Sequence, residues 1–91
     1  MTNLERQIQN WILQAVAAYE RGGDGAPMPD FMLRQSIRSA HPGIAFAEGD
    51  LAGHIATSEE NKFITGITDP LDGKVWNLTN KGKLRLNLVR G

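Results

Sequence analysis

The sequence lacks cysteine, and it has no apolar stretch long enough to span a membrane. Without cysteine, a disulfide framework, a thiolate metal site and a cysteine nucleophile are all excluded. Ten Lys and Arg residues balance ten Asp and Glu residues, so no charge excess indicates nucleic acid or membrane as a partner. The first residues are polar, so we expect no signal peptide, no membrane association and a cytoplasmic location. The length of 91 residues predicts one domain over residues 1–91.

The zero net charge conceals an uneven distribution of charge along the chain. Residues 1–46 are balanced, with four acidic and four basic side chains. Residues 47–72 carry six acids against the one base Lys62, whereas residues 73–91 carry five bases and no acid. Those five bases are Lys74, Lys81, Lys83, Arg85 and Arg90. The basic segment either lies against the acidic one and neutralises it, or forms a patch for an anionic partner.

Three segments carry apolar residues at helical spacing, at 3–21, 30–40 and about 49–60. The first has one apolar face over about five turns, and the residues after it, 22–29, are typical of a loop. Pro29 and the carboxylate after it favour the start of the second helix.

The second half of the chain changes to a β pattern. Residues 63–68 are β-branched and aromatic, 69–73 hold two turn signals, and 74–78 return as a second strand, which predicts a hairpin. Trp76 and Val75 have opposite strand parity, so we expect one of the two to be partly exposed.

The pattern of the last segment fits two structures equally well. Residues 83–89 alternate leucine with polar residues, as a third strand would. The same leucines, with Thr79 as the N-cap, also suit a short helix.

The string Trp76-Asn77-Leu78-Thr79-Asn80-Lys81-Gly82 resembles the "aromatic, x, Leu-Thr-x-x-Gly" signature that follows the wing in bacterial winged-helix transcription regulators. The resemblance covers about residues 30–90. It implies an α+β fold, a winged helix with a three-helix core, a C-terminal β-hairpin wing and a short closing helix. Because the threonine begins that helix in the family, the resemblance favours the helix for the last segment.

The resemblance also implies DNA binding and transcriptional control. The helix at about 49–60 would enter the major groove, where His54, Thr57 and Asn61 would contact base edges. The phosphate contacts would come from the five basic residues of the last segment, with Arg34 and Arg38 in addition: Lys74, Lys81, Lys83, Arg85 and Arg90.

The reading helix departs from the family pattern in its charge. It has no lysine or arginine, and Asp50, Glu59 and Glu60 make it acidic, whereas phosphate neutralisation usually dominates affinity for DNA. The same face suits a solvated helix surface equally well. The alternative function is therefore a winged-helix protein-interaction module, which would dock a protein partner through this acidic helix and the basic segment.

Other site types find little support in the sequence. The two histidines, His41 and His54, have no metal-ligand spacing, and no constellation supports catalysis, so we expect no metal, no cofactor and no enzyme activity. The apolar surplus of Trp11, Val16 and Tyr19 on the first helix predicts a homodimer. Phe31 or its neighbour Met32 is expected to project into solvent.

Overall fold

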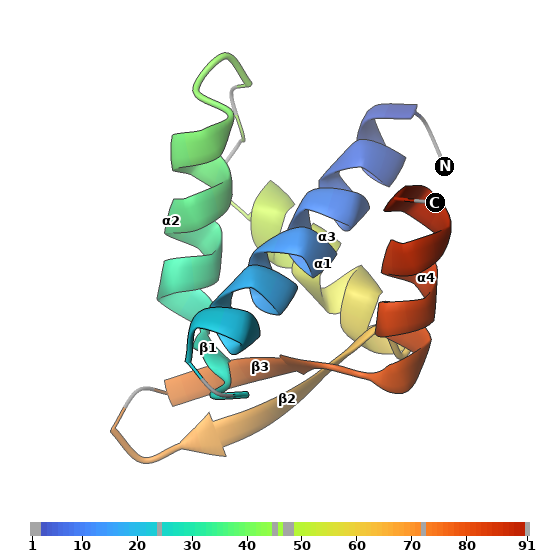
Figure 1. Ribbon diagram of the computed structural model, residues 1–91. Helices are drawn as coiled ribbons and strands as arrows, with labels where there is room; N and C mark the ends of the chain where they lie inside the picture. The colour runs from blue at the N-terminus through green and yellow to red at the C-terminus, as the bar shows by residue number, and fades with distance from the viewer. Residues whose placement is uncertain (1–2, 24, 45, 47–48, 72, 91) are drawn as a thin grey trace.

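The computed structural model describes residues 3–23, 25–44, 46, 49–71 and 73–90, without the side chains of 88–90. These residues form four helices and three strands in an α+β arrangement (Figure 1). The elements are α1 (Asn3–Gly22), β1 (Met28–Pro29), α2 (Asp30–Ala40), α3 (Asp50–Glu60), β2 (Ile64–Asp69), β3 (Gly73–Leu78) and α4 (Asn80–Arg90). The predicted helices, the hairpin and the α+β class are confirmed.

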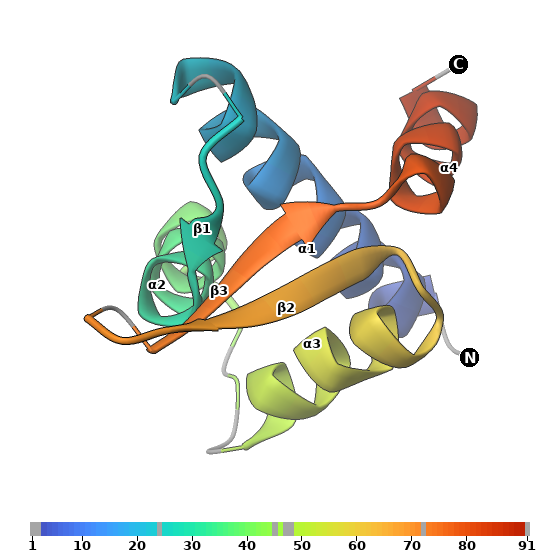
Figure 2. The same cartoon turned by 90° about the horizontal axis from the view of Figure 1, so that it is seen from below.

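The strands form an antiparallel sheet in the order β1-β3-β2. The helices lie over one face of this sheet, and the view from below looks onto its other face (Figures 1 and 2). The β2–β3 register runs from Ile64 opposite Leu78 to Asp69 opposite Gly73. On the helix-covered face this register places Gly66 opposite Trp76, where the bulky indole needs room.

The core is built around α1, which contacts the other three helices and the sheet. Because its apolar residues recur every three to four positions, one face of α1 is buried along most of its length. The largest completely buried side chains of the core are Ile12, Leu13, Val16, Leu33, Ile37, Leu51 and Ile64.

A buried polar network joins α1 to α3. Gln9 on α1 is only 7% exposed, and its Nε2 donates to the carbonyl oxygen of His54 at 2.9 Å. The hydroxyl of Ser58, which is fully buried, donates to the Gln9 Oε1. Each buried polar atom therefore has a partner, which fixes the position of α3 relative to α1.

The last segment is a helix, and the third strand is the wrong alternative. The Thr79 Oγ1 accepts the Gly82 N–H at 3.0 Å, which caps α4, and it also lies 3.0 Å from the Phe63 carbonyl oxygen. Leu86 is buried against the core one helical turn beyond Gly82. The cap and the burial of Leu86 outweigh the alternation of the leucines, because a helix turns one face toward the core and Leu84 is exposed on another.

Two expectations about the sheet are wrong. Met28 and Pro29, in the predicted loop, form the short strand β1, which pairs with Trp76 and Val75 of β3. Neither Val75 nor Trp76 is exposed, although they face opposite sides of the sheet. The reason is that β3 is the central strand, so Val75 lies between Pro29 and Ile67 and is covered by its neighbours.

Candidate nucleic-acid interface

The outward face of α3 carries short side chains and acidic side chains. Leu51, Ile55 and Ser58 are buried, and Gly53, Ala56 and Glu60 are exposed on the opposite side. The short side chains would allow another surface to come close to the helix backbone. The acids of α3, Asp50, Glu59 and Glu60, would oppose an approaching phosphate backbone.

The three residues predicted to contact bases differ in their exposure and in their surroundings. His54 is half-buried, and its backbone carbonyl is held by Gln9. The half-buried Thr57 donates its hydroxyl to the Gly53 carbonyl oxygen at 3.0 Å, as side chains of this type often do within helices. Asn61 is exposed after the end of α3, where it lines a hollow with residues of α1 and α4.

The five predicted phosphate contacts are divided among separate places. Lys81 and Arg85 lie on one side of α4, and Lys83 lines a different hollow, beside Arg21 of α1. Lys74 lies on β3, and the side chain of Arg90 lies outside the described residues. Because α4 and α2 lie on opposite sides of α1, the basic residues of α4 do not form one continuous surface with those of α2 (Figures 1 and 2).

Lys74 joins the hairpin to α3. Its Nζ lies 3.6 Å from the Glu59 Oε2 and 5.1 Å from the centroid of the Trp76 ring. Here a basic residue of the segment 73–91 contacts an acidic residue of the segment 47–72, as we expect if the basic segment neutralises the acidic one. The pair is weak because both side chains are at least 40% exposed. A second possible acid, Glu48, lies outside the described residues.

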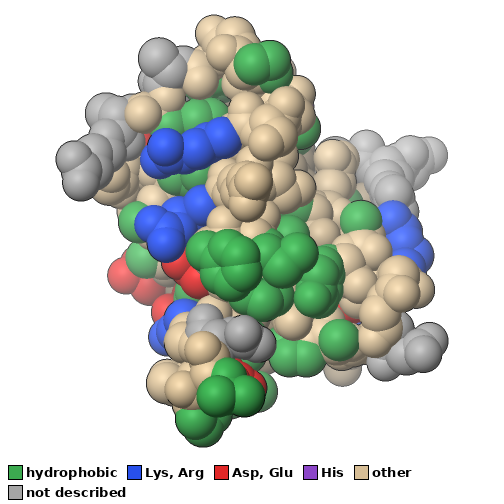
Figure 3. Space-filling view, turned by 90° about the vertical axis from the view of Figure 1, so that its left-hand side faces the viewer, with side chains coloured by type: hydrophobic (Ala, Val, Ile, Leu, Met, Phe, Trp, Pro, Cys, Tyr) green, Lys and Arg blue, Asp and Glu red, His purple; other side chains and the backbone are tan. Residues whose placement is uncertain are grey.

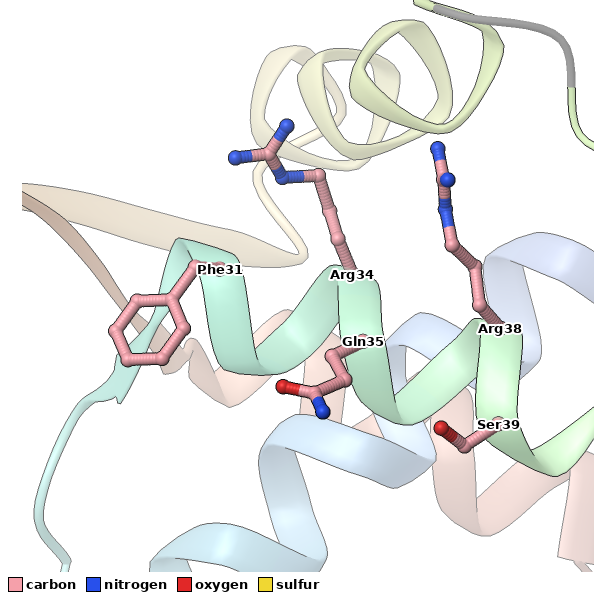
Figure 4. A pocket seen from close by; sticks show the side chains of 5 residues that line it. All are labelled: Phe31, Arg34, Gln35, Arg38 and Ser39. Atoms are coloured by element: carbon pink, nitrogen blue, oxygen red, sulfur yellow. The ribbon is translucent and has the colours of Figure 1, made fainter.

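A second basic surface lies on α2. Arg34 and Arg38 are one turn apart and border a hollow that Phe31, Gln35 and Ser39 also line (Figure 4). In this view both arginines project toward the side of α2 where α3 lies. The space-filling view of this face shows basic side chains beside an apolar area (Figure 3). Phe31 is 55% exposed, which confirms that an apolar side chain projects outward here.

The position of Arg34 is set from within the core. The Trp76 Nε1–H donates to the Asp30 Oδ1 at 2.9 Å, and the Arg34 Nε lies 3.0 Å from the other oxygen of that carboxylate. Asp30 is only 28% exposed, whereas the Arg34 side chain is 45% exposed. The guanidinium is therefore oriented by Asp30 while it stays accessible to a partner.

The apolar surplus of α1 is used within the fold. Val16 is fully buried, and Tyr19 packs against the core. Trp11 stacks on His41, with the ring centroids 3.5 Å apart and an angle of 15° between the planes. The homodimer stays a prediction. The three residues that suggested it make contacts within the fold instead of forming an exposed apolar surface.

The sequence contained a signal for the surface on α2. Arg34 and Arg38 have i, i+4 spacing in a predicted helix, which places both on one face.

No family model, curated protein or solved structure matches this chain. Among the described helices none is both long enough and apolar enough to cross a membrane.

Proposed function

We propose that this chain is a winged helix-turn-helix domain that binds double-stranded DNA. The element order α1-β1-α2-α3-β2-β3-α4 supports the proposal, because α2 and α3 stand in the order of a helix-turn-helix pair and the β2–β3 hairpin, which contacts α3 through β2, stands in the place of the wing. In such domains the second helix of the pair enters the major groove. The proposed reading element is therefore α3.

The observation that carries the proposal is that cations on α2 and on the hairpin are directed toward α3. Arg34 and Arg38 project from α2, and Lys74 reaches α3 from the hairpin. A duplex lying along the exposed Gly53 and Ala56 would bring its phosphates to these three cations. The proposed phosphate contacts therefore differ from those that the sequence favoured on α4.

The acids on this surface reduce affinity without excluding DNA. The Arg34–Asp30 and Lys74–Glu59 pairs are partly exposed, and pairs near the surface stabilise a protein by only about 0–1 kcal/mol, so a phosphate can replace the carboxylate. α3 itself has no lysine or arginine that could balance the negative charges of Asp50 and Glu60. We therefore propose weak, strongly salt-dependent binding for the isolated domain.

Base recognition would come from small side chains. Ala56 and the methyl group of Thr57 suit contact with a thymine methyl, and the Thr57 hydroxyl can still accept a hydrogen bond. His54 lies at the flank of this face. Asn61 belongs to another hollow and is not part of the proposed interface.

Binding of a labelled random-sequence duplex between about 50 and 200 mM salt tests the proposal. With three phosphate contacts, log K should fall against log salt with a slope of about −2.7. The variant Arg34→Gln/Arg38→Gln should lower that slope by about 1.8 and weaken binding. The matched control Arg21→Gln/Lys83→Gln removes the same charge from α1 and α4, beside a different hollow, and should leave the slope unchanged. An equal effect of both variants would contradict the proposed face.

A second candidate function is a winged-helix protein-interaction module. The acidic outward face of α3 favours it, and so do the exposed apolar residues of the hairpin, Ile67 and Leu71, which is 94% exposed. Absence of DNA binding at about 50 mM salt would favour this candidate, because non-specific binding is strongest at low salt.

A further inference from the structure

A second basic hollow lies between α1, the end of α3 and α4, on the opposite side of α1 from the α2 surface. Two cations line it, Lys81 and Arg85, one turn apart on α4. The lining also includes the apolar side chains of Leu13 and Phe63 and the carboxamide of Asn61. No carboxylate is among its described lining residues, so the hollow carries a local charge of two positive units.

The hollow is held in a fixed shape by the start of α4. The Thr79 hydroxyl lies 3.0 Å from the Phe63 carbonyl oxygen and caps α4 through Gly82. The Lys81 Nζ lies 5.1 Å from the centroid of the Phe63 ring, in a cation–π arrangement. The aromatic ring and the ammonium group are thus positioned together before any ligand arrives, which lowers the entropy lost on binding.

The cations are free to bind an anion. Both Lys81 and Arg85 are exposed, and within the described part of the chain neither forms a salt bridge. A phosphomonoester carries a charge between about −1.5 and −2 near pH 7, which matches two cations better than a single carboxylate does. The planar guanidinium of arginine also suits two oxygens of one phosphate.

We propose that this hollow binds a phosphomonoester that carries a flat ring, such as a nucleoside monophosphate or the 5′-phosphorylated end of a nucleic-acid strand. The phosphate lies between Lys81 and Arg85. The base packs against Phe63, since base–aromatic stacking is a common contribution to such binding. The carboxamides of Asn61 and Asn10, which also lines the hollow, reach the base edge.

Isothermal titration with adenosine monophosphate, adenosine and inorganic phosphate tests this inference. Adenosine monophosphate should bind at least about 10-fold more tightly than either fragment, because the phosphate and the ring are held at once. Arg85→Gln should weaken its binding by about 10-fold or more, as expected for a lost charged hydrogen bond. The control Lys83→Gln, on the other side of α4, should leave binding within about two-fold.

Three results would overturn the inference: no binding of adenosine monophosphate, inorganic phosphate binding as tightly, or equal losses in Arg85→Gln and Lys83→Gln. A 5′-phosphorylated oligonucleotide that binds more tightly than both adenosine monophosphate and its unphosphorylated form would identify a strand end, and equal affinities with the nucleotide would identify a free nucleotide. The inference does not rest on duplex binding by α2 and α3. Failure of either proposal is therefore distinguishable from failure of the other, because each has its own variants.

Discussion

Two helix glycines, Gly82 and Gly53, should respond to alanine in opposite directions. Alanine has a higher helix propensity than glycine by about 1 kcal/mol, so propensity alone predicts that both substitutions stabilise the protein. Gly53 is exposed on α3, and a Cβ there would have no neighbour within 4 Å. At Gly82 a Cβ would stand 2.1 Å from the Phe63 carbonyl oxygen and 3.2 Å from the Leu78 Cγ.

The magnitude for Gly82→Ala follows from these distances. Carbon–oxygen contacts ordinarily lie at about 3.3–3.6 Å, so α4 must move away from Phe63 by more than ~1 Å. Overpacking of this kind costs about 1–3 kcal/mol, and loss of the Thr79 cap costs about 1 kcal/mol more. After the gain of about 1 kcal/mol in propensity, the net destabilisation should be about 1–3 kcal/mol.

Urea unfolding followed by circular dichroism measures both variants. With a slope near 1 kcal/mol per molar urea, expected for a small domain, Gly82→Ala should lower the midpoint by about 1–3 M. Gly53→Ala should raise it by up to about 1 M. A Gly82→Ala variant as stable as Gly53→Ala would refute the close approach of α4 to Phe63.

Two further substitutions test the buried polar contacts by the same assay. Gln9→Leu should destabilise the fold by about 1–3 kcal/mol, because the Ser58 hydroxyl and the His54 carbonyl lose their partner. Combined with Ser58→Ala, its cost should differ from the sum of the single costs by more than about 0.5 kcal/mol, and strict additivity would contradict direct contact. Trp76→Phe should cost about 1–3 kcal/mol, because Asp30 loses the indole N–H and the core loses volume; an unchanged midpoint would contradict that role.

The helices could be predicted because their apolar spacing is long and regular. The apolar face of α1 extends over the whole of residues 3–21, and in the structure it forms the centre of the core. The strand β1 could not be predicted, because two residues carry no periodicity and Pro29 argues against a strand. Burial of Val75 could not be predicted either, since it depends on β3 having a neighbour on both sides.

The candidate site was harder to predict than the fold. The charge sum of the last segment was visible in the sequence, but helical geometry separates Lys83 from Lys81 and Arg85. The proposed role of Phe63 depends on the start of α4 lying against this residue, which no local pattern encodes. In contrast, the signature from Leu78 to Gly82 has a physical explanation, because its threonine caps α4 and its glycine allows the close contact with Phe63.

In the proposed complex, DNA lies against α3 between the arginines of α2 and the hairpin. The most direct test is a ¹⁵N–¹H titration of the protein with a short duplex at about 50 mM salt, where electrostatic binding is strong. We expect the largest shift changes at the backbone amides of Gln35, Gly53 and Ala56, with little change at Lys83 and Asn87 on α4. Changes concentrated on α4, or none at any amide, would contradict it.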